Sequence, residues 1–280
     1  MIQAIHHVGL VVQRLSEAYR LYRDVLGLPL VREAEIADQG VRAALLAAGD
    51  SEIELLEPLG PATGVGRFLA RHGEGLHHVC FETPDVAREL TAMKEKGAEL
   101  IDATPRPGLA GQIGFLHPRS CAGVLVELAT IELAGSRAGA RPLGAATPTS
   151  PAPAASAASA APAATPTSAG RLRLKRVVVG AREPRETAAV FRRLFEFPEI
   201  AMNGPRVMLG VGRGALLIVP NAEVGGLEGM VALSMVAGEF ESLVTSLKSA
   251  GTRGMLRGTG EITLEPVATH GVHLHISRYE

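Results

Sequence analysis

The sequence has no tryptophan, few aromatic residues and only two cysteines. Aromatic residues make up 4% of the 280 residues, which argues against a protein that binds nucleic acids or sugars by stacking. The two cysteines, Cys80 and Cys121, have no C-x-x-C spacing. They therefore indicate neither a disulfide framework nor a thiolate metal site. They favour a reducing compartment, and we expect a cytoplasmic protein.

The sequence also lacks an excess of charge of either sign and a long apolar run. Its 28 Lys and Arg residues nearly balance 29 Asp and Glu residues, so there is no electrostatic footprint for nucleic acid. No window approaches the roughly 18 consecutive apolar residues of a membrane span. Residues 1–7 lack the basic stretch and apolar core of a signal peptide. We expect neither nucleic acid nor membrane as a partner.

The sequence contains enough hydrophobic residues for two domains, with a low-complexity segment between them. Hydrophobic residues make up 46% of the chain. All residues from Gly144 to Gly170 are Ala, Pro, Thr, Ser or Gly, and such a stretch cannot bury enough apolar area to become ordered. We predict domains at 1–133 and 171–280 joined by a disordered linker at 134–170. The charges divide unequally, with 12 basic and 18 acidic residues in 1–135 and 14 basic and 11 acidic in 171–280.

An internal repeat divides the first domain. The run IHHVGL at residues 5–10 returns as LHHVCF at residues 76–81, 71 positions later. Each run is strand-like and leads into a helical pattern that ends at a glycine, Gly27 or Gly97, as expected of a left-handed cap. Further strand candidates follow in both copies. Each copy is therefore predicted to contain a strand, a helix and two or three more strands.

The second domain repeats this plan twice more, less clearly. The run Gly210-x-Gly212-x-Gly214 resembles a dinucleotide-binding fingerprint, but strand patterns surround it, so we interpret it as a hairpin turn. Four similar units in two pairs predict an α+β fold of paired βαβββ modules, each pair forming one cupped mixed sheet.

Equivalent positions in the two N-terminal units hold side chains that bind metals. His7 and His78 occupy matching places in the first strands, and Glu54 and Glu127 follow 47 and 49 residues later. A single histidine doublet is more often a surface feature, but its recurrence with a Glu at similar spacing favours a joint site. Two imidazoles and two carboxylates suit a divalent cation. Alternation along a strand predicts that the first histidines, His6 and His77, point to the opposite face.

These stretches carry a family resemblance. Residues 1–130 resemble the methylmalonyl-CoA epimerases of the vicinal oxygen chelate superfamily, whose paired βαβββ modules cup a metal. The matching stretches are IHHVGLVV at 5–12, IELLEPLG at 53–60, GLHHVCFET at 75–83 and, most specifically, FLHPRSCAGVLVEL at 115–128. Because the C-terminal domain repeats the same plan, we expect it to be a degenerate domain of the same superfamily.

The resemblance also implies a ligand set and a reaction. The family's metal ligands correspond to His7, Glu54, His78 and Glu127, and Glu127 is also implied as a catalytic acid or base. Co²⁺ is the expected ion, with Mn²⁺, Zn²⁺ or Ni²⁺ as alternatives, and no organic cofactor is expected. The substrate would be a CoA thioester, methylmalonyl-CoA, whose 2R and 2S forms interconvert by proton abstraction at C2 through a metal-stabilised enolate. Such an enzyme belongs to propionate metabolism, and a homodimer is compatible with it.

One departure from the family concerns the second acid or base. Some members have a carboxylate shortly after a Gln-Gly pair, where this chain has Ala43, which cannot exchange a proton. The candidates that remain are Glu54, a metal-bound water or a residue from elsewhere. In the H-P motif, His117 is expected to be structural or near the substrate. Arg119 is expected either to contact an anionic group of the substrate or to lie on the surface.

Aligning the C-terminal units on the N-terminal ones places Arg176, Leu216, Ala232 and His275 at the four ligand positions. This set does not predict a metal site, so the C-terminal domain is expected to serve as an interaction surface, lid or regulatory binder. Other functions stay open: a glyoxalase I-like lyase, a two-domain extradiol dioxygenase, or a small-molecule-binding protein of the same fold without catalysis.

Overall fold

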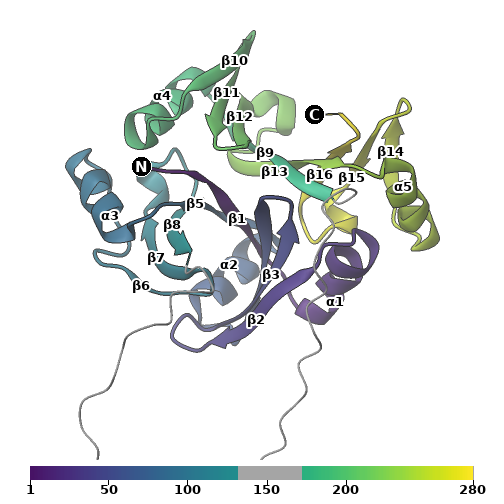
Figure 1. The fold of residues 1–280 in the computed structure, drawn as a ribbon, viewed down its shortest axis with the longest axis horizontal. Coiled ribbons are helices and arrows are strands. Elements are labelled where there is room, and N and C mark those ends of the chain that lie inside the picture. Colours follow the sequence, from purple (N-terminus) through teal and green to yellow (C-terminus); the bar gives the residue numbers. More distant parts are fainter. Residues whose placement is uncertain (132–171, 280) are drawn as a thin grey trace, which may run out of the picture.

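The computed structural model describes residues 1–131 and 172–279. They form two curved eight-stranded sheets with helices packed against them (Figure 1). The expected α+β fold of paired βαβββ modules is confirmed. The predicted linker, residues 134–170, lies outside the described residues, so its disorder and the domain boundaries at 133 and 171 stay predictions.

The first sheet is mixed and consists of two similar halves. Its strands are β1 (Ala4–Val11), β2 (Leu30–Ile36), β3 (Val41–Ala48), β4 (Ser51–Pro58), β5 (Gly75–Glu82), β6 (Arg106–Pro107), β7 (Gly111–Leu116) and β8 (Val126–Ile131). They lie in the order β2-β3-β4-β1-β5-β8-β7-β6. The central strands β1 and β5 are antiparallel, whereas β4 runs parallel to β1 and β8 runs parallel to β5. The two N-terminal units therefore share one sheet, joined through their first strands.

The second sheet repeats the first strand by strand. Its strands are β9 (Leu172–Ala181), β10 (Glu199–Asn203), β11 (Arg206–Val211), β12 (Gly214–Pro220), β13 (Gly229–Ala237), β14 (Gly254–Arg257), β15 (Glu261–Leu264) and β16 (His273–Ser277). Their order is β10-β11-β12-β9-β13-β16-β15-β14. Val211 pairs with Gly214 across the turn between β11 and β12, so the glycine run forms a hairpin as expected.

Helices cover one face of each sheet. In the N-terminal half these are α1 (Leu15–Tyr19), which continues as a π-helical segment (Arg20–Val25), and α3 (Val86–Glu95); in the C-terminal half they are α4 (Pro184–Phe195) and α5 (Phe240–Ser249), with 3-10 turns at Pro118–Ser120, Asn221–Val224 and Pro266–Ala268. Tyr22 and Leu90 join the core that lies against this face. The predicted glycine ends are confirmed, with φ of 69° at Gly27 and 82° at Gly97. The opposite face of the first sheet is left for a site.

One further helix, α2 (Gly64–His72), was not expected from the sequence. Three glycines and a proline lie between residues 60 and 66, and both residue types disfavour a helix interior. A helix signal was nevertheless present, because the Thr63 side chain accepts a hydrogen bond from the Gly66 amide and caps the helix. Phe68 and Leu69 pack against an apolar cluster on the face of the first sheet that lies opposite α1 and α3, which we call the site face. The helix therefore forms part of the wall above that face.

The ladder between β1 and β5 contains two β-bulges. Ile5 pairs with Phe81 and His7 with Cys80, so that His6 is an extra residue in β1. Similarly, Gly9 pairs with His78 and Leu10 with Leu76, which makes His77 the extra residue in β5. A bulge redirects side chains near its position. The β9–β13 ladder has register shifts at the corresponding places, where Lys175 and Val231 are the extra residues.

The two sheets pack against each other through their helix-covered faces. A continuous buried cluster includes residues from both. The Phe81 ring meets those of Phe195 and Phe197 at centroid distances of 5.2 and 5.0 Å. The Tyr22 hydroxyl donates a hydrogen bond to the Thr269 carbonyl at 2.9 Å. The core of the molecule thus extends across the contact between its halves.

Two glycine contacts relate the halves by approximate two-fold symmetry. Gly75 opens β5 and Gly229 opens β13, so these positions are equivalent. A Cβ atom built on Gly75 would lie 3.5 Å from the Gly271 carbonyl oxygen, and one on Gly229 would lie 3.5 Å from the Gly123 carbonyl oxygen. Gly123 and Gly271 are equivalent as well, since they precede Glu127 and His275 by four residues. Each half therefore presents the same surface to the other.

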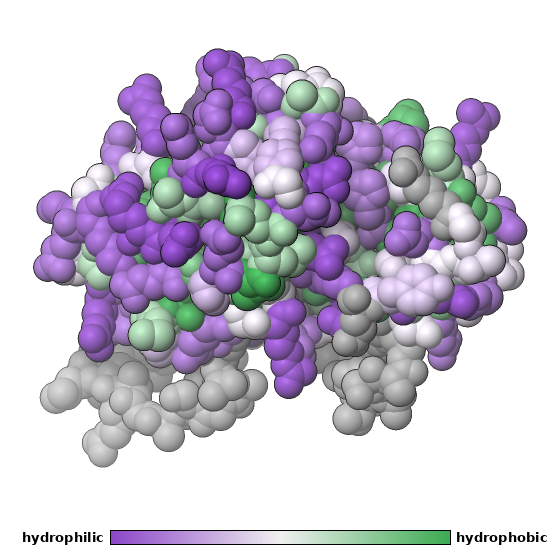
Figure 2. Space-filling model, turned by 90° about the horizontal axis from the view of Figure 1, so that it is seen from above, coloured by the Kyte–Doolittle hydropathy of each residue, from purple (hydrophilic) through white to green (hydrophobic). Residues whose placement is uncertain are grey.

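One face of the outer surface can be followed in Figure 2. Figure 2 looks onto one face, where hydrophilic side chains predominate and apolar ones form small groups between them. No helix within residues 1–131 and 172–279 is long and apolar enough to cross a membrane.

Candidate metal centre and cavity

The four predicted ligand residues meet on the site face of the first sheet. His7 lies on β1, Glu54 on β4, His78 on β5 and Glu127 on β8, which are the four central strands. The apolar neighbours of these residues enter the core on the other face. All four side chains are buried, with exposures of 1 to 6%. The repeat thus brings together residues that are far apart in the sequence.

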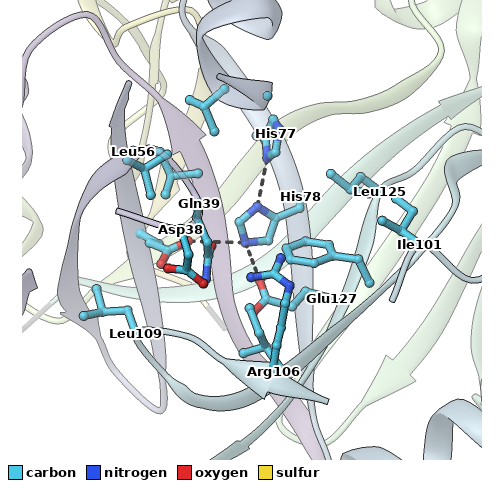
Figure 3. A pocket seen from close by; sticks show the side chains of 16 residues that line it. Asp38, Gln39, Leu56, His77, His78, Ile101, Arg106, Leu109, Leu125 and Glu127 are labelled. Atoms are coloured by element: carbon cyan, nitrogen blue, oxygen red, sulfur yellow. Dashed lines mark hydrogen bonds and ion pairs between the residues drawn. The ribbon is translucent and has the colours of Figure 1, made fainter. Parts of the chain in front are cut away.

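The donor atoms are close to one another. Nε2 of His78 lies 2.9 Å from Oε2 of Glu127 and 3.3 Å from Oε2 of Glu54 (Figure 3). Nε2 of His7 lies 3.4 and 3.5 Å from the same two oxygens. The two Nε2 atoms are 3.0 Å apart. Each imidazole therefore faces both carboxylates.

This geometry fits a divalent cation. Bonds of about 2.1 Å to N and O ligands place neighbouring donors roughly 3.0 Å apart in octahedral and 3.4 Å apart in tetrahedral coordination, and the distances above fall close to these values. All four donors lie within 4.8 Å of one another. Two carboxylates buried side by side are costly without positive charge between them. The donor set, two imidazoles and two carboxylates, suits ions such as Co²⁺, Mn²⁺, Zn²⁺ or Ni²⁺.

The first histidine of each doublet contacts the second. Nδ1 of His6 lies 2.7 Å from Nδ1 of His7, and Nδ1 of His77 lies 3.0 Å from Nδ1 of His78. Burial, together with the charge of the neighbouring histidine, lowers the pKa of both His6 and His77 to about 3. These two rings are therefore neutral and able to accept a hydrogen bond from Nδ1–H of His7 and His78. That arrangement leaves Nε2 of each inner ring free to bind a metal.

The expectation that His6 and His77 point to the opposite face was wrong. Simple alternation fails because both residues are the extra residues of β-bulges. His77 even lines the cavity described below. No sequence pattern in one strand reports such a bulge, since it arises from how two strands pair.

The ionisation of the cluster is strongly coupled. Burial disfavours the charged form of His78, but the hydrogen-bonding carboxylates of Glu127 and Glu54 outweigh this effect and raise its pKa to about 9. Burial likewise opposes the charged form of Glu127, and the two imidazoles lower its pKa well below the ordinary value. Without a metal, the site therefore holds a proton on an imidazole at neutral pH.

A cavity of about 470 Å³ opens above the cluster. Its described lining comprises Asp38, Gln39, Val41, Glu54, Leu56, Gly64, Val65, His77, His78, Ile101, Arg106, Leu109, Ile113, Phe115, Leu125 and Glu127. Arg119 and His117 are absent from this lining. Instead, Nδ1 of His117 accepts a hydrogen bond from the Arg119 amide at the start of a 3-10 turn. His117 is therefore structural, and Arg106 is the cavity arginine that the sequence did not reveal.

Two further residues limit the chemistry of the site. Ala43 is fully buried in the apolar cluster beside the cavity, so it provides only packing there. Cys80 lies close enough to His6 and His7 to form a second group of metal-capable side chains. Burial and the nearby carboxylates raise the pKa of the Cys80 thiol well above its ordinary value. His7 belongs both to the group with His6 and Cys80 and to the group of four predicted ligands. The set of His7, Glu54, His78 and Glu127 is the better candidate centre.

Strand register identifies the equivalent positions on the second sheet. His7 pairs with Glu52 and Gly9 with Glu54 on β4, whereas Arg176 pairs with Ala215 on β12. The counterpart of Glu54 is therefore Leu217, one residue beyond the Leu216 that the alignment suggested. The remaining counterparts are Arg176, Ala232 and His275, as aligned. Both groups of metal-capable residues found in the described chain lie on the first sheet.

Comparison with known proteins agrees with this architecture. Residues 6–116 match the family model described as Glyoxalase/Bleomycin resistance protein/Dioxygenase superfamily. The ethylmalonyl-CoA/methylmalonyl-CoA epimerase of Cereibacter sphaeroides is 34% identical over 46% of this chain and 98% of its own length. The chain belongs to this superfamily. An uncharacterised Bacillus subtilis protein, YqjC, is 38% identical over 44% of the chain and 89% of its own length.

Among solved structures, a variant of Streptomyces coelicolor methylmalonyl-CoA epimerase in complex with 2-nitronate-propionyl-CoA is 36% identical, with a TM-score of 0.47. It covers 48% of this chain and all of that one. The superfamily match lies in the N-terminal half, and the shared strand order shows the same fold in the C-terminal half.

Proposed function

We propose that this protein is a divalent-metal-dependent epimerase that interconverts the 2R and 2S forms of methylmalonyl-CoA. The observation that carries the proposal is the buried set of His7, Glu54, His78 and Glu127 at the base of a cavity. The chain is 34% identical to nearly the whole of a relative named as an ethylmalonyl-CoA/methylmalonyl-CoA epimerase, which supports the choice of substrate.

In this proposal the four residues hold the ion. When bound, the cation would act as a Lewis acid that stabilises negative charge on the thioester oxygen. Co²⁺ remains our first choice of metal. His6 and His77 accept hydrogen bonds from the inner imidazoles and keep their Nε2 lone pairs directed at the centre of the cluster.

Glu127 is the proposed acid or base on one side of the substrate. Its carboxylate lines the cavity and has a pKa far below the ordinary value. It is therefore ionised at neutral pH and able to accept the C2 proton at a carboxylate oxygen.

Inversion at C2 needs a second group on the other side, and Ala43 is not that group. Among the described residues that line the cavity, Glu54 and Asp38 are the remaining carboxylates. Glu54 comes from β4, on the other side of β1 and β5 from the β8 strand that bears Glu127. We propose Glu54 as the second acid or base, with Asp38 as the alternative that the test below separates.

The proposed partner is thus a small-molecule thioester, and the proposed location is the cytoplasm. Cys80 and Cys121 are both free and buried, in keeping with a reducing compartment.

Deuterium exchange tests the proposal. Full-length protein reconstituted with Co²⁺, Mn²⁺, Zn²⁺ or Ni²⁺ is incubated with one epimer of methylmalonyl-CoA in D₂O, and deuterium at C2 is followed by NMR. We expect exchange accompanied by formation of the other epimer. Absence of exchange with all four metals, in protein whose fold is intact, would exclude the epimerase activity.

The same assay assigns the two proton-exchanging groups. Glu127→Gln should abolish exchange with one epimer, because that face loses its base. Glu54→Gln should then allow exchange into one epimer without inversion, whereas Asp38→Asn should behave like wild type. If Asp38→Asn and not Glu54→Gln separates exchange from inversion, the second base is Asp38.

A further inference from the structure

Arg106 is held in a fixed orientation on the wall of the cavity. Its backbone pairs with Ile113 across the short β6–β7 ladder, which places both side chains on the cavity face. Nε of Arg106 donates to Oδ1 of Asp102 at 3.1 Å. Oδ2 of Asp102 in turn accepts from the Phe115 amide at 3.0 Å. The guanidinium is thereby tied to the sheet through its inner nitrogen.

The remaining face of the guanidinium is directed toward the candidate metal centre. Its Cζ atom lies 5.5 Å from the centroid of the Phe115 ring, and that ring meets His78 edge-on at a centroid distance of 5.5 Å. Figure 3 shows Arg106 extending toward the side of the cavity that holds His78 and Glu127. In the described part of the chain, no hydrogen bond involves its two terminal Nη groups. They form a free fork of the kind that binds a carboxylate with two hydrogen bonds.

The charge of the cavity makes this fork distinctive. Among the described lining residues, Arg106 is the one lysine or arginine, against the carboxylates of Asp38, Glu54 and Glu127. The N-terminal 135 residues contain 18 acidic and only 12 basic residues. An anionic acyl group that enters this cavity therefore needs local positive charge besides a bound cation.

We propose that the Nη fork of Arg106 binds the free carboxylate of the acyl group and so selects 2-alkylmalonyl thioesters over thioesters of monocarboxylic acids. The inference rests on the proposed function, because it assumes that the acyl group lies in this cavity. Asp102 is then a positioning residue, since it holds Nε and leaves both Nη groups to the substrate. Phe115 supports the guanidinium by a cation–π contact.

The test compares two thioesters that differ only at the group in question. Isobutyryl-CoA carries a methyl group where methylmalonyl-CoA carries the carboxylate. Calorimetry of the Co²⁺-loaded full chain measures the affinity of each for wild type, Arg106→Gln and Arg106→Lys. Arg88→Gln is the matched control, because Arg88 is exposed on α3, on the helix-covered face of the sheet.

Wild type should prefer methylmalonyl-CoA, and Arg106→Gln should reduce that preference about 10- to 100-fold, as expected for loss of a charged hydrogen-bonding pair. Arg106→Lys should retain part of the preference, and Arg88→Gln all of it. Equal weakening of both thioesters in Arg106→Gln would overturn the proposal, because Arg106 would then contact the CoA moiety. An unchanged preference in both Arg106 variants would also overturn it.

The deuterium assay separates this inference from the proposed function. Loss of preference in Arg106→Gln, with no C2 exchange in wild type, would refute the epimerase activity and support the carboxylate site. If wild type shows C2 exchange but the preference for methylmalonyl-CoA does not depend on Arg106, the epimerase activity is supported and the carboxylate site at Arg106 is refuted. If wild-type protein bound neither thioester, both proposals would fall.

Discussion

The two halves of the molecule share a backbone plan and differ in what they place on it. Both sheets have the same strand order, and their central ladders have register shifts at the same places. On the first sheet the bulges present two histidine doublets. On the second, the corresponding pairs are Lys175-Arg176 and Val231-Ala232. The backbone feature that shapes the site is thus also present on the second sheet, where the described residues contain no group of metal-capable side chains.

A second difference lies in what covers the two sheets. Between β4 and β5 the first half has helix α2, whose Phe68 and Leu69 pack over the cavity face. Between β12 and β13 the second half has only a 3-10 turn, Asn221–Val224. The shared backbone plan thus supplies a curved surface, whereas the site also requires particular side chains and a wall above them.

Replacing a ligand on the first sheet by the residue at the equivalent position of the second sheet tests the role of the side chains most directly. His78→Ala introduces the residue found at Ala232, and we expect Co²⁺ affinity to fall by more than about 100-fold, beyond the effect usual for an outer-sphere change. Calorimetric titration measures this loss. His275→Ala is the control on the second sheet, where the stoichiometry of tight binding should not change. Unaltered affinity in His78→Ala would show that the four-residue set is not the metal site.

The pH dependence of metal binding tests the ionisation of the cluster on the first sheet. His78, with a pKa raised to about 9, carries a proton at pH 7 that a metal must displace. This pKa exceeds the ordinary 6.5, so protonation of His78 stabilises the metal-free fold. The stabilisation is fully present below pH 6.5 and is lost as the pH rises through about 9. Co²⁺ affinity should rise about tenfold per pH unit from 7 toward 9. Calorimetry in buffers of different ionisation enthalpy counts the protons released, and release of none at pH 7 would contradict this account.

The outer histidines should have a smaller effect. His6→Ala and His77→Ala each remove the acceptor beside an inner imidazole, which should weaken metal binding about 10- to 100-fold. His6→Asn and His77→Asn keep a polar acceptor close to the backbone and should restore part of the loss. Nitrogen chemical shifts of His7 and His78 report the tautomer directly. If the alanine variants bind metal normally and the inner rings keep their tautomer, the outer histidines only fill space.

A substitution away from the metal centre tests the approximate symmetry of the two halves. Gly123 and Gly271 are equivalent and both have positive φ, of 86° and 83°. A Cβ atom on Gly271 would collide with the Glu74 carbonyl group, whereas one on Gly123 would meet nothing within 4 Å. Gly271→Ala should therefore lower the free energy of unfolding by about 1 to 3 kcal/mol more than Gly123→Ala does. Thermal unfolding of both variants measures the difference, and equal melting temperatures would argue against this contact.

Much of the N-terminal fold could be predicted because its two units repeat, so a strand or helix recognised in one unit supported the same element in the other. The doublets at 6–7 and 77–78 fixed the first strands, and Gly27 and Gly97 fixed the helix ends. The meeting of His7 with Glu127 followed from the same repeat, since equivalent strands of a shared sheet bring equivalent residues together.

Other features depend on interactions that the one-dimensional pattern does not contain. The bulges at His6 and His77 depend on the pairing of β1 with β5. The cavity position of Arg106 depends on a two-residue strand too short to have a periodic pattern. Helix α2 has a weak sequence signal for a different reason, because glycines at its start disfavour a helix and only Thr63 caps it.

The reciprocal glycine contacts have a consequence for how the halves find each other. Gly75 with Gly271 and Gly229 with Gly123 build a contact of the kind two separate copies of one domain would make. Here both surfaces belong to one chain, so their encounter is intramolecular and has an effective concentration independent of how dilute the protein is. Dilution therefore does not separate the N-terminal half from the C-terminal half that packs against it. The C-terminal half, whatever else it does, acts as a partner that is always present at a ratio of one to one.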